Sequence, residues 1–75
     1  MFPSHDQYNL PPIERTTNAI NERLLFLINS VEFYGRKFDK FDVIEVKQML
    51  NVLKDRKQKT KHALRVKKIL KIQTV

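Results

Sequence analysis

The sequence contains no cysteine, no tryptophan and a single glycine, Gly35. Without cysteine there is no disulfide framework, no Cys-ligated metal and no thiol nucleophile. A loop that cradles phosphate needs several glycines, which argues against a nucleotide-binding loop of that kind. No stretch approaches the ~18 apolar residues of a membrane span, and no basic segment followed by an apolar run opens the chain. We therefore expect a soluble intracellular protein of the cytoplasm or nucleoid, folded by apolar packing.

Side chains that support catalysis or metal binding are also sparse. The two histidines, His5 and His62, show none of the HxxxH, HxxE or cysteine spacings of metal sites. Ser4 and Ser30 lack a nearby histidine and a strained Gly-x-Ser-x-Gly turn. The acidic residues between positions 39 and 45 are better explained by turns and helix caps than by paired acid–base chemistry. We therefore predict a protein that is not an enzyme and has no metal or cofactor.

The charge of the chain is unevenly distributed. At 75 residues the chain is expected to form one small domain, 1–75. Residues 1–45 carry five basic and seven acidic side chains, whereas residues 46–75 carry ten basic and one acidic. The two parts therefore have charges of −2 and +9. This asymmetry is typical of a structural half joined to a half that meets nucleic acid, an acidic protein surface or an anionic membrane.

The hydrophobic spacing predicts an all-α fold, preceded by an extended arm over residues 1–11 that holds Pro3 and Pro11. The first helix is predicted over about 12–34, because Pro12 suits a first helical turn and Gly35 suits a stop. Its apolar seam repeats at alternating spacings of four and three residues. The seam consists of Ile13, Ile20, Leu24, Leu27, Val31 and Tyr34.

The seam has two interpretations. It can form the core of one chain, or, because its spacing is that of a coiled coil, the interface of a homodimer. Leu25 and Ile28 widen the stripe beyond what a single partner helix is expected to cover. This surplus narrowly favours the dimer.

A second helix is predicted over about 42–54, since Asp42 and Glu45 have the spacing of a capping box. One arc of this helix is apolar and is expected to face the first helix; it consists of Val43, Val46, Met49, Leu50 and Leu53. The two helices should form an antiparallel hairpin whose end is sealed by Phe38 and Phe41.

A third, basic helix is predicted over about 59–72 within the basic segment 54–72. On one continuous helix, Val66 and Leu70 would lie roughly 180° around the axis from Val46 and Leu50, at ~100° per residue. We therefore expect a break near residues 54–60, with Asp55 or Thr60 capping the new helix. The alternative is an unbroken helix whose C-terminal part projects from the body.

The third helix separates an apolar arc from a basic arc. Lysines of the basic arc have no acidic neighbours at i,i+4, which argues against a merely solvated face. The candidate binding residues for an anionic partner are Lys57, Lys59, Thr60, Lys61, Leu64, Arg65, Lys67, Lys68 and Lys71.

Nucleic acid is the first candidate partner, because a row of cations gains affinity from counterion release at phosphates. Duplex DNA is favoured over RNA, since the basic segment lacks aromatic residues for base stacking. Lysine outnumbers arginine by seven to two over residues 54–71, which predicts weak sequence specificity and a regulatory or architectural role. The alternative is a small inhibitor or adaptor that docks on an acidic surface of a larger protein, such as a polymerase or nuclease. An anionic membrane is least favoured, because the apolar arc lacks Trp and Phe.

Overall fold

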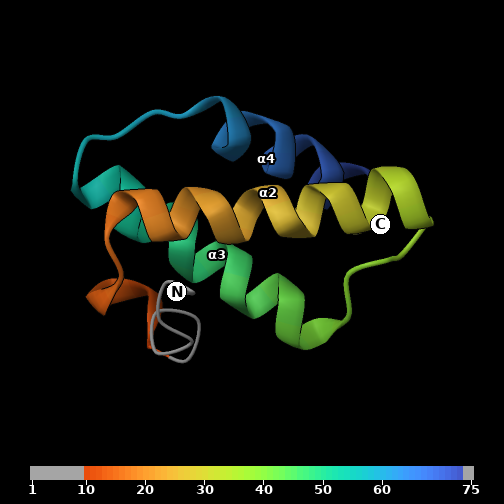
Figure 1. Cartoon of the computed structure of the whole chain (residues 1–75), viewed down its shortest axis with the longest axis horizontal. Helices are drawn as coiled ribbons and strands as arrows, with labels where there is room; N and C mark the ends of the chain where they lie inside the picture. Colours follow the sequence, from red (N-terminus) through yellow and green to blue (C-terminus); the bar gives the residue numbers. More distant parts are fainter. Residues whose placement is uncertain (1–9, 74–75) are drawn as a thin grey trace, which may run out of the picture.

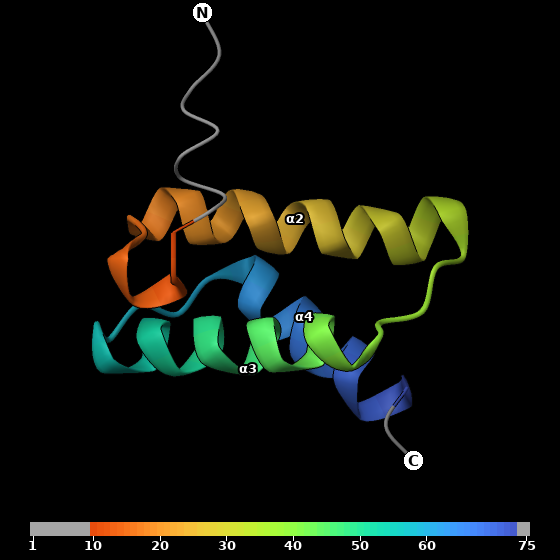
Figure 2. The same ribbon diagram turned by 90° about the horizontal axis from the view of Figure 1, so that it is seen from below.

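The computed structural model describes residues 10–73, which form three α-helices and one short 3-10 turn (Figure 1). In chain order these are η1 (Pro12–Glu14), α2 (Thr17–Tyr34), α3 (Lys40–Asp55) and α4 (Lys61–Gln73). Helices α2 and α3 run antiparallel, and α4 packs against both of them (Figures 1 and 2). The predicted all-α hairpin with a separate third helix is confirmed. Of the predicted arm, residues 1–9 lie outside the described residues, while Leu10 and Pro11 are exposed.

The first helix begins later than predicted. Pro12 opens only the 3-10 turn η1, and the backbone is extended at Arg15 and Thr16 before α2 begins. The Thr16 side chain caps α2 by accepting a hydrogen bond from the Ala19 N–H at 3.1 Å. The sequence therefore holds two competing start signals, and the threonine cap begins the long helix. Its end was predicted correctly, because Gly35 follows α2 in the left-handed conformation with a φ of 64°.

The second helix begins at Lys40, two residues before its predicted start, and its N-cap residue differs from the predicted one. Asp39, not Asp42, is the N-cap of α3. The Asp42 N–H donates to Asp39 Oδ1 at 2.8 Å, and the Asp39 N–H donates to Asp42 Oδ2 at 3.2 Å. Aspartate therefore occupies both the N-cap and the N3 position of the capping box. The box predicted from Asp42 and Glu45 was placed three residues too far along the chain. Glu45 instead forms ion pairs with Arg15 and Arg23.

The earlier helix start changes the roles of the two phenylalanines that were predicted to seal the hairpin. Phe38 is half-buried against the core, and its N–H donates to Gln73 Oε1 at 2.9 Å. Phe41 lies in the first turn of α3 and is 71% exposed, with Lys40 Nζ 5.4 Å from the ring centroid. The prediction for Phe41 was therefore wrong.

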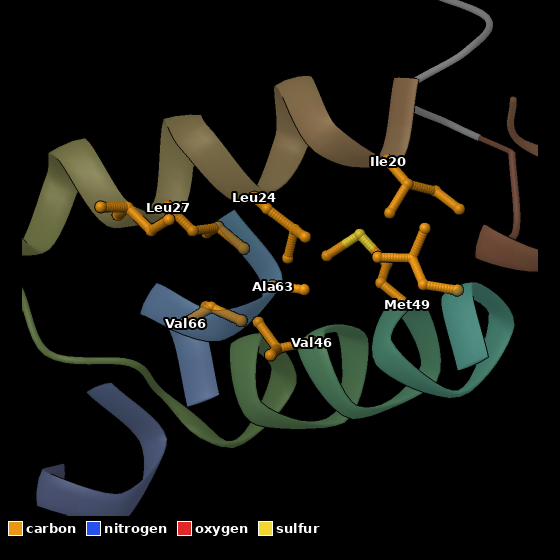
Figure 3. Packing of buried hydrophobic residues seen from close by; sticks show 9 residues of the cluster. Ile20, Leu24, Leu27, Val46, Met49, Ala63 and Val66 are labelled. Atoms are coloured by element: carbon orange, nitrogen blue, oxygen red, sulfur yellow. The ribbon is translucent and has the colours of Figure 1, made fainter. Parts of the chain in front are cut away.

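The core lies where the three helices meet, and every helix contributes to it (Figure 3). Side chains from α2 face those from α3, and α4 inserts Ala63 and Val66 beside them. The apolar stripe of α4 is therefore used inside the same small domain, which explains why the chain breaks before it. The buried cluster consists of Ile20, Leu24, Leu27, Ile28, Val46, Met49, Leu53, Ala63 and Val66.

The predicted seam of the first helix is largely intramolecular. Its central residues Ile20, Leu24 and Leu27 are fully buried, and Val31 is half-buried, whereas Ile13 and Tyr34 at the two ends are 71% and 84% exposed. The prediction that the whole seam lies in the core of one chain was therefore wrong at its two ends.

Ile28, which was expected to remain for a second protomer, is fully buried. Leu25, the other residue of this surplus, is half-buried and lies outside the core cluster, so the chain's own packing occupies only part of the apolar face that favoured a homodimer.

We accordingly expect a monomer in solution. Two chains of formal charge +7 repel each other, and the central seam residues Ile20, Leu24 and Leu27 are fully buried, so they cannot offset that repulsion in a dimer. Sedimentation equilibrium at micromolar concentration should give the 9.0 kDa mass of one chain, independent of concentration. A mass that rises with concentration would instead show that the chain self-associates through exposed side chains, such as Phe26 and Phe33 of α2.

Candidate anion-binding surface

Helix α4 has the two-sided character that its sequence predicts. Ala63 and Val66 are buried, and Ile69 and Leu70 are packed against the core. The opposite side of the helix carries exposed cations and one exposed leucine, Leu64, at 58% exposure. The exposed lysines of α4 are Lys61, Lys67, Lys68 and Lys71.

The turn that precedes α4 brings two further lysines to this surface without a glycine. Helix α3 closes with the Lys57 N–H donating to the Lys54 carbonyl and the Gln58 N–H donating to the Leu53 carbonyl. Lys57 takes the left-handed position of this closure, with a φ of 56°. Glycine is the usual residue there, so a lysine marks a strained position. Thr60 then caps α4 by accepting from the Ala63 N–H at 3.1 Å, as predicted.

The arginines of the chain are used inside the fold. Arg15 and Arg23 bind Glu45, and Arg36 binds Asp42 at 2.9 Å. Arg56 donates to the carbonyl of Ile13 and to the Thr17 hydroxyl. These arginines bind partners far along the chain or fix a helix start, so they stabilise the packing of the helices.

Arg65 is the fifth arginine, and it was predicted to meet the anionic partner. Its guanidinium forms an ion pair with Glu32 on α2. It therefore faces a neighbouring helix, while the lysines of α4 face solvent. The pair is itself half-exposed, so it tethers α4 to α2 without removing Arg65 from the surface.

The lysines follow the opposite pattern. No ion pair between residues 10–73 involves a lysine, although all ten lysines lie in this range and all are exposed. Eight of them belong to the second half of the chain, on α3, the 56–60 turn and α4. These eight lysines, which we call the lysine surface, are Lys47, Lys54, Lys57, Lys59, Lys61, Lys67, Lys68 and Lys71.

A groove of about 880 Å³ runs between α3 and α4 at the end where the 56–60 turn connects them. Four apolar side chains line it, from Leu50 and Leu53 on α3 and from Ala63 and Leu64 on α4. Asn51, Gln58 and Thr60 also line it, and no carboxylate of residues 10–73 does. Its five lysines are Lys47, Lys54, Lys57, Lys59 and Lys67.

The groove divides the candidate residues from the sequence into three groups. Lys57, Lys59, Thr60, Leu64 and Lys67 line the groove. The second group lies on α4 outside it and consists of Lys61, Lys68 and Lys71. Arg65 forms the third group, because it is paired with Glu32.

Sequence reasoning missed the contribution of α3 to this surface. Lys47 and Lys54 are seven residues apart and therefore lie on one face of α3, two turns from each other. The seven-residue spacing of Lys47 and Lys54 already indicated that they lie on the same face of a helix. Only the packing of α4 beside α3 shows that this face borders a groove.

Within the part of the chain that the structure describes, no three His, Cys, Asp or Glu side chains gather into a metal site. None of its helices is long and apolar enough to cross a membrane.

Comparisons with protein-family models, with curated proteins and with solved structures found no match to this chain. The fold and the surface define it as a small three-helix protein with a lysine surface, and its function is inferred from that surface.

Proposed function

We propose that the protein is a non-enzymatic nucleic-acid-binding protein that binds duplex DNA through its lysine surface. The observation that carries this proposal is that the arginines and the lysines have different roles in the structure. The arginines hold the helices together, while eight exposed lysines of residues 46–73 have no ion-pair partner among the described residues. An intracellular location and a regulatory or architectural role belong to the same proposal.

Unpaired lysines repel one another and gain most from a partner with densely spaced negative charge. A helix of 13 residues such as α4 is about 20 Å long at ~1.5 Å per residue. That length of duplex carries about a dozen phosphates, which is more than the lysine surface can neutralise. Phosphate contacts of this kind release counterions and need no particular base sequence.

Lysine chemistry also predicts low sequence selectivity. Base reading in the major groove relies on planar groups that make two hydrogen bonds at once, such as arginine on guanine. An ammonium group is a point charge without this geometry, and the planar Arg65 is paired with Glu32. We expect the protein to bind many duplex sequences with similar affinity.

The placement of aromatic side chains favours a duplex over a single strand. Single-strand and RNA-binding surfaces stack bases on exposed aromatic rings within a basic groove. Among residues 10–73, the exposed rings of Phe26, Phe33, Tyr34 and Phe41 lie on α2 and at the start of α3, and none of them lines the groove.

Fluorescence anisotropy with two unrelated duplexes of about 20 bp and a single strand of equal length tests the proposal. We expect the two duplexes to bind within about threefold of each other and the single strand to bind more weakly. The double variant Lys61→Gln/Lys68→Gln should weaken duplex binding. Lys37→Gln/Lys40→Gln removes the same charge from the loop after α2 and from the first residue of α3, and it should have little effect. Equal losses from both pairs would mean that only net charge matters, and absence of binding would refute the proposal.

A further inference from the structure

We propose that the groove between α3 and α4 binds an acidic amphipathic helix from a partner protein. This partner is additional to the duplex, and the inference rests on the groove rather than on duplex binding.

The apolar floor of the groove is the first observation. Duplex phosphates require cations and hydrogen-bond donors, and they gain nothing from aliphatic surface. Leu64 is nevertheless 58% exposed beside the groove, and Leu50 is only half-buried. Leu53 and Ala63 continue this surface into the core. A ligand with an apolar side would bury leucine surface that the fold itself leaves open.

The charge around the groove is the second observation. Lysines come from both helices and from the connecting turn, so they surround the floor on more than one side. None of the carboxylates in the described part of the chain lines the groove to neutralise them. The complementary ligand therefore has an apolar centre flanked by carboxylates, which is the pattern of an acidic amphipathic segment.

The architecture identifies the segment as a helix. Peptides that bind as an added strand need an open sheet edge, and residues 10–73 contain no strand. Proline-rich peptides dock between aromatic rings, and no aromatic residue that the structure describes lines this groove. Phosphorylated motifs are recognised by arginine clusters, whereas the cations here are lysines. An amphipathic helix needs only an apolar groove between two helices, and its leucines at i, i+3, i+4 and i+7 would lie on the floor.

A second copy of this chain does not suit the groove. Each copy carries a formal charge of +7, and the groove is the most lysine-rich part of the surface described above. Bringing another copy to it would add repulsion. The charge complementarity points to a partner with excess carboxylates.

The probe is a labelled synthetic peptide of about 18 residues, roughly five helical turns, with leucines on one face and glutamates beside them. A second peptide has the same composition in an order that scatters the leucines around the helix. We expect the first peptide to bind at least about tenfold more tightly than the second, because only its leucines reach the floor together.

Two matched pairs of variants locate the binding site. Leu64→Ser alters the groove, whereas Ile72→Ser alters an exposed apolar residue of the same helix outside it. Lys67→Gln and Lys68→Gln remove neighbouring charges, of which only Lys67 lines the groove. We expect Leu64→Ser to weaken peptide binding about tenfold and Ile72→Ser to leave it unchanged. Lys67→Gln should weaken it more than Lys68→Gln does.

The same variants measured with duplex DNA separate this inference from the proposed function. Duplex binding should be unaffected by Leu64→Ser and should fall similarly for Lys67→Gln and Lys68→Gln. The groove inference is overturned if both peptides bind alike, if Leu64→Ser and Ile72→Ser have equal effects, or if Leu64→Ser weakens the duplex as much as the peptide. It is also overturned if the free protein self-associates and Leu64→Ser abolishes that association. Only the comparison with the duplex requires duplex binding; the other outcomes are decided with the peptides and the free protein alone.

Discussion

Replacement of Lys61, Lys67, Lys68 and Lys71 together by glutamine should weaken duplex binding by roughly 10²–10³-fold at about 0.1 M salt. All four side chains are exposed on α4 and form no ion pair with a described residue, so they are available to phosphates. Each lost contact removes the release of about one counterion. Anisotropy with a labelled duplex measures the loss.

The fold should survive this change. Exposed charge substitutions outside the core usually alter the free energy of unfolding by less than about 0.5 kcal/mol each. Circular dichroism and a thermal melt check that the variant is folded. The matched control replaces the same four lysines with arginine, which keeps the charge, and it should bind within about threefold of the original protein. If the glutamine variant binds every duplex as the original does, the lysines of α4 are merely solvated.

The second large effect is expected in the core. Leu24→Ala should lower the free energy of unfolding by about 2–5 kcal/mol, as truncation of a buried leucine usually does. Leu24 is fully buried on α2, where side chains of α3 and α4 meet it. A chain of 75 residues has only a few kcal/mol of net stability, so this loss can unfold it.

Urea unfolding followed by circular dichroism measures the effect. Leu64→Ala is the control, because the same truncation at a side chain that is 58% exposed should cost about 1 kcal/mol or less. Leu50→Ala should fall between the two, since Leu50 is half-buried. Equal unfolding midpoints for Leu24→Ala and Leu64→Ala would show that the core is misplaced.

The break before α4 was predictable because local and global signals agreed. Val46 and Val66 cannot face one core on a continuous helix, and Thr60 supplies a cap where the chain resumes. The stop at Gly35 was equally clear, since a left-handed residue there favours glycine. These features depend on spacing along the chain, which the sequence displays directly.

Other features depended on contacts that spacing does not reveal. Asp39 and Asp42 compete for the same capping role, and their reciprocal hydrogen bonds decide which residue begins α3. Lys57 adopts a left-handed conformation, which cannot be predicted from a lysine in the sequence.

The division between arginines and lysines was also hidden. Arg15 and Glu45 are 30 positions apart, and Arg65 and Glu32 are 33 apart. From the sequence alone, all of these cations are expected to be surface charges. The structure shows that the arginines are paired and that lysines of α3 join those of α4 around one groove.

Duplex binding by the unaltered protein across a salt series tests the central claim most directly. If about five lysines meet phosphates, the logarithm of the association constant should fall against the logarithm of the salt concentration with a slope of about −4.5. Two unrelated duplexes should give the same slope, because the contacts are made to phosphates. The absence of a complex at about 50 mM salt, or a slope flatter than about −1, would contradict the claim that the lysine surface binds duplex DNA.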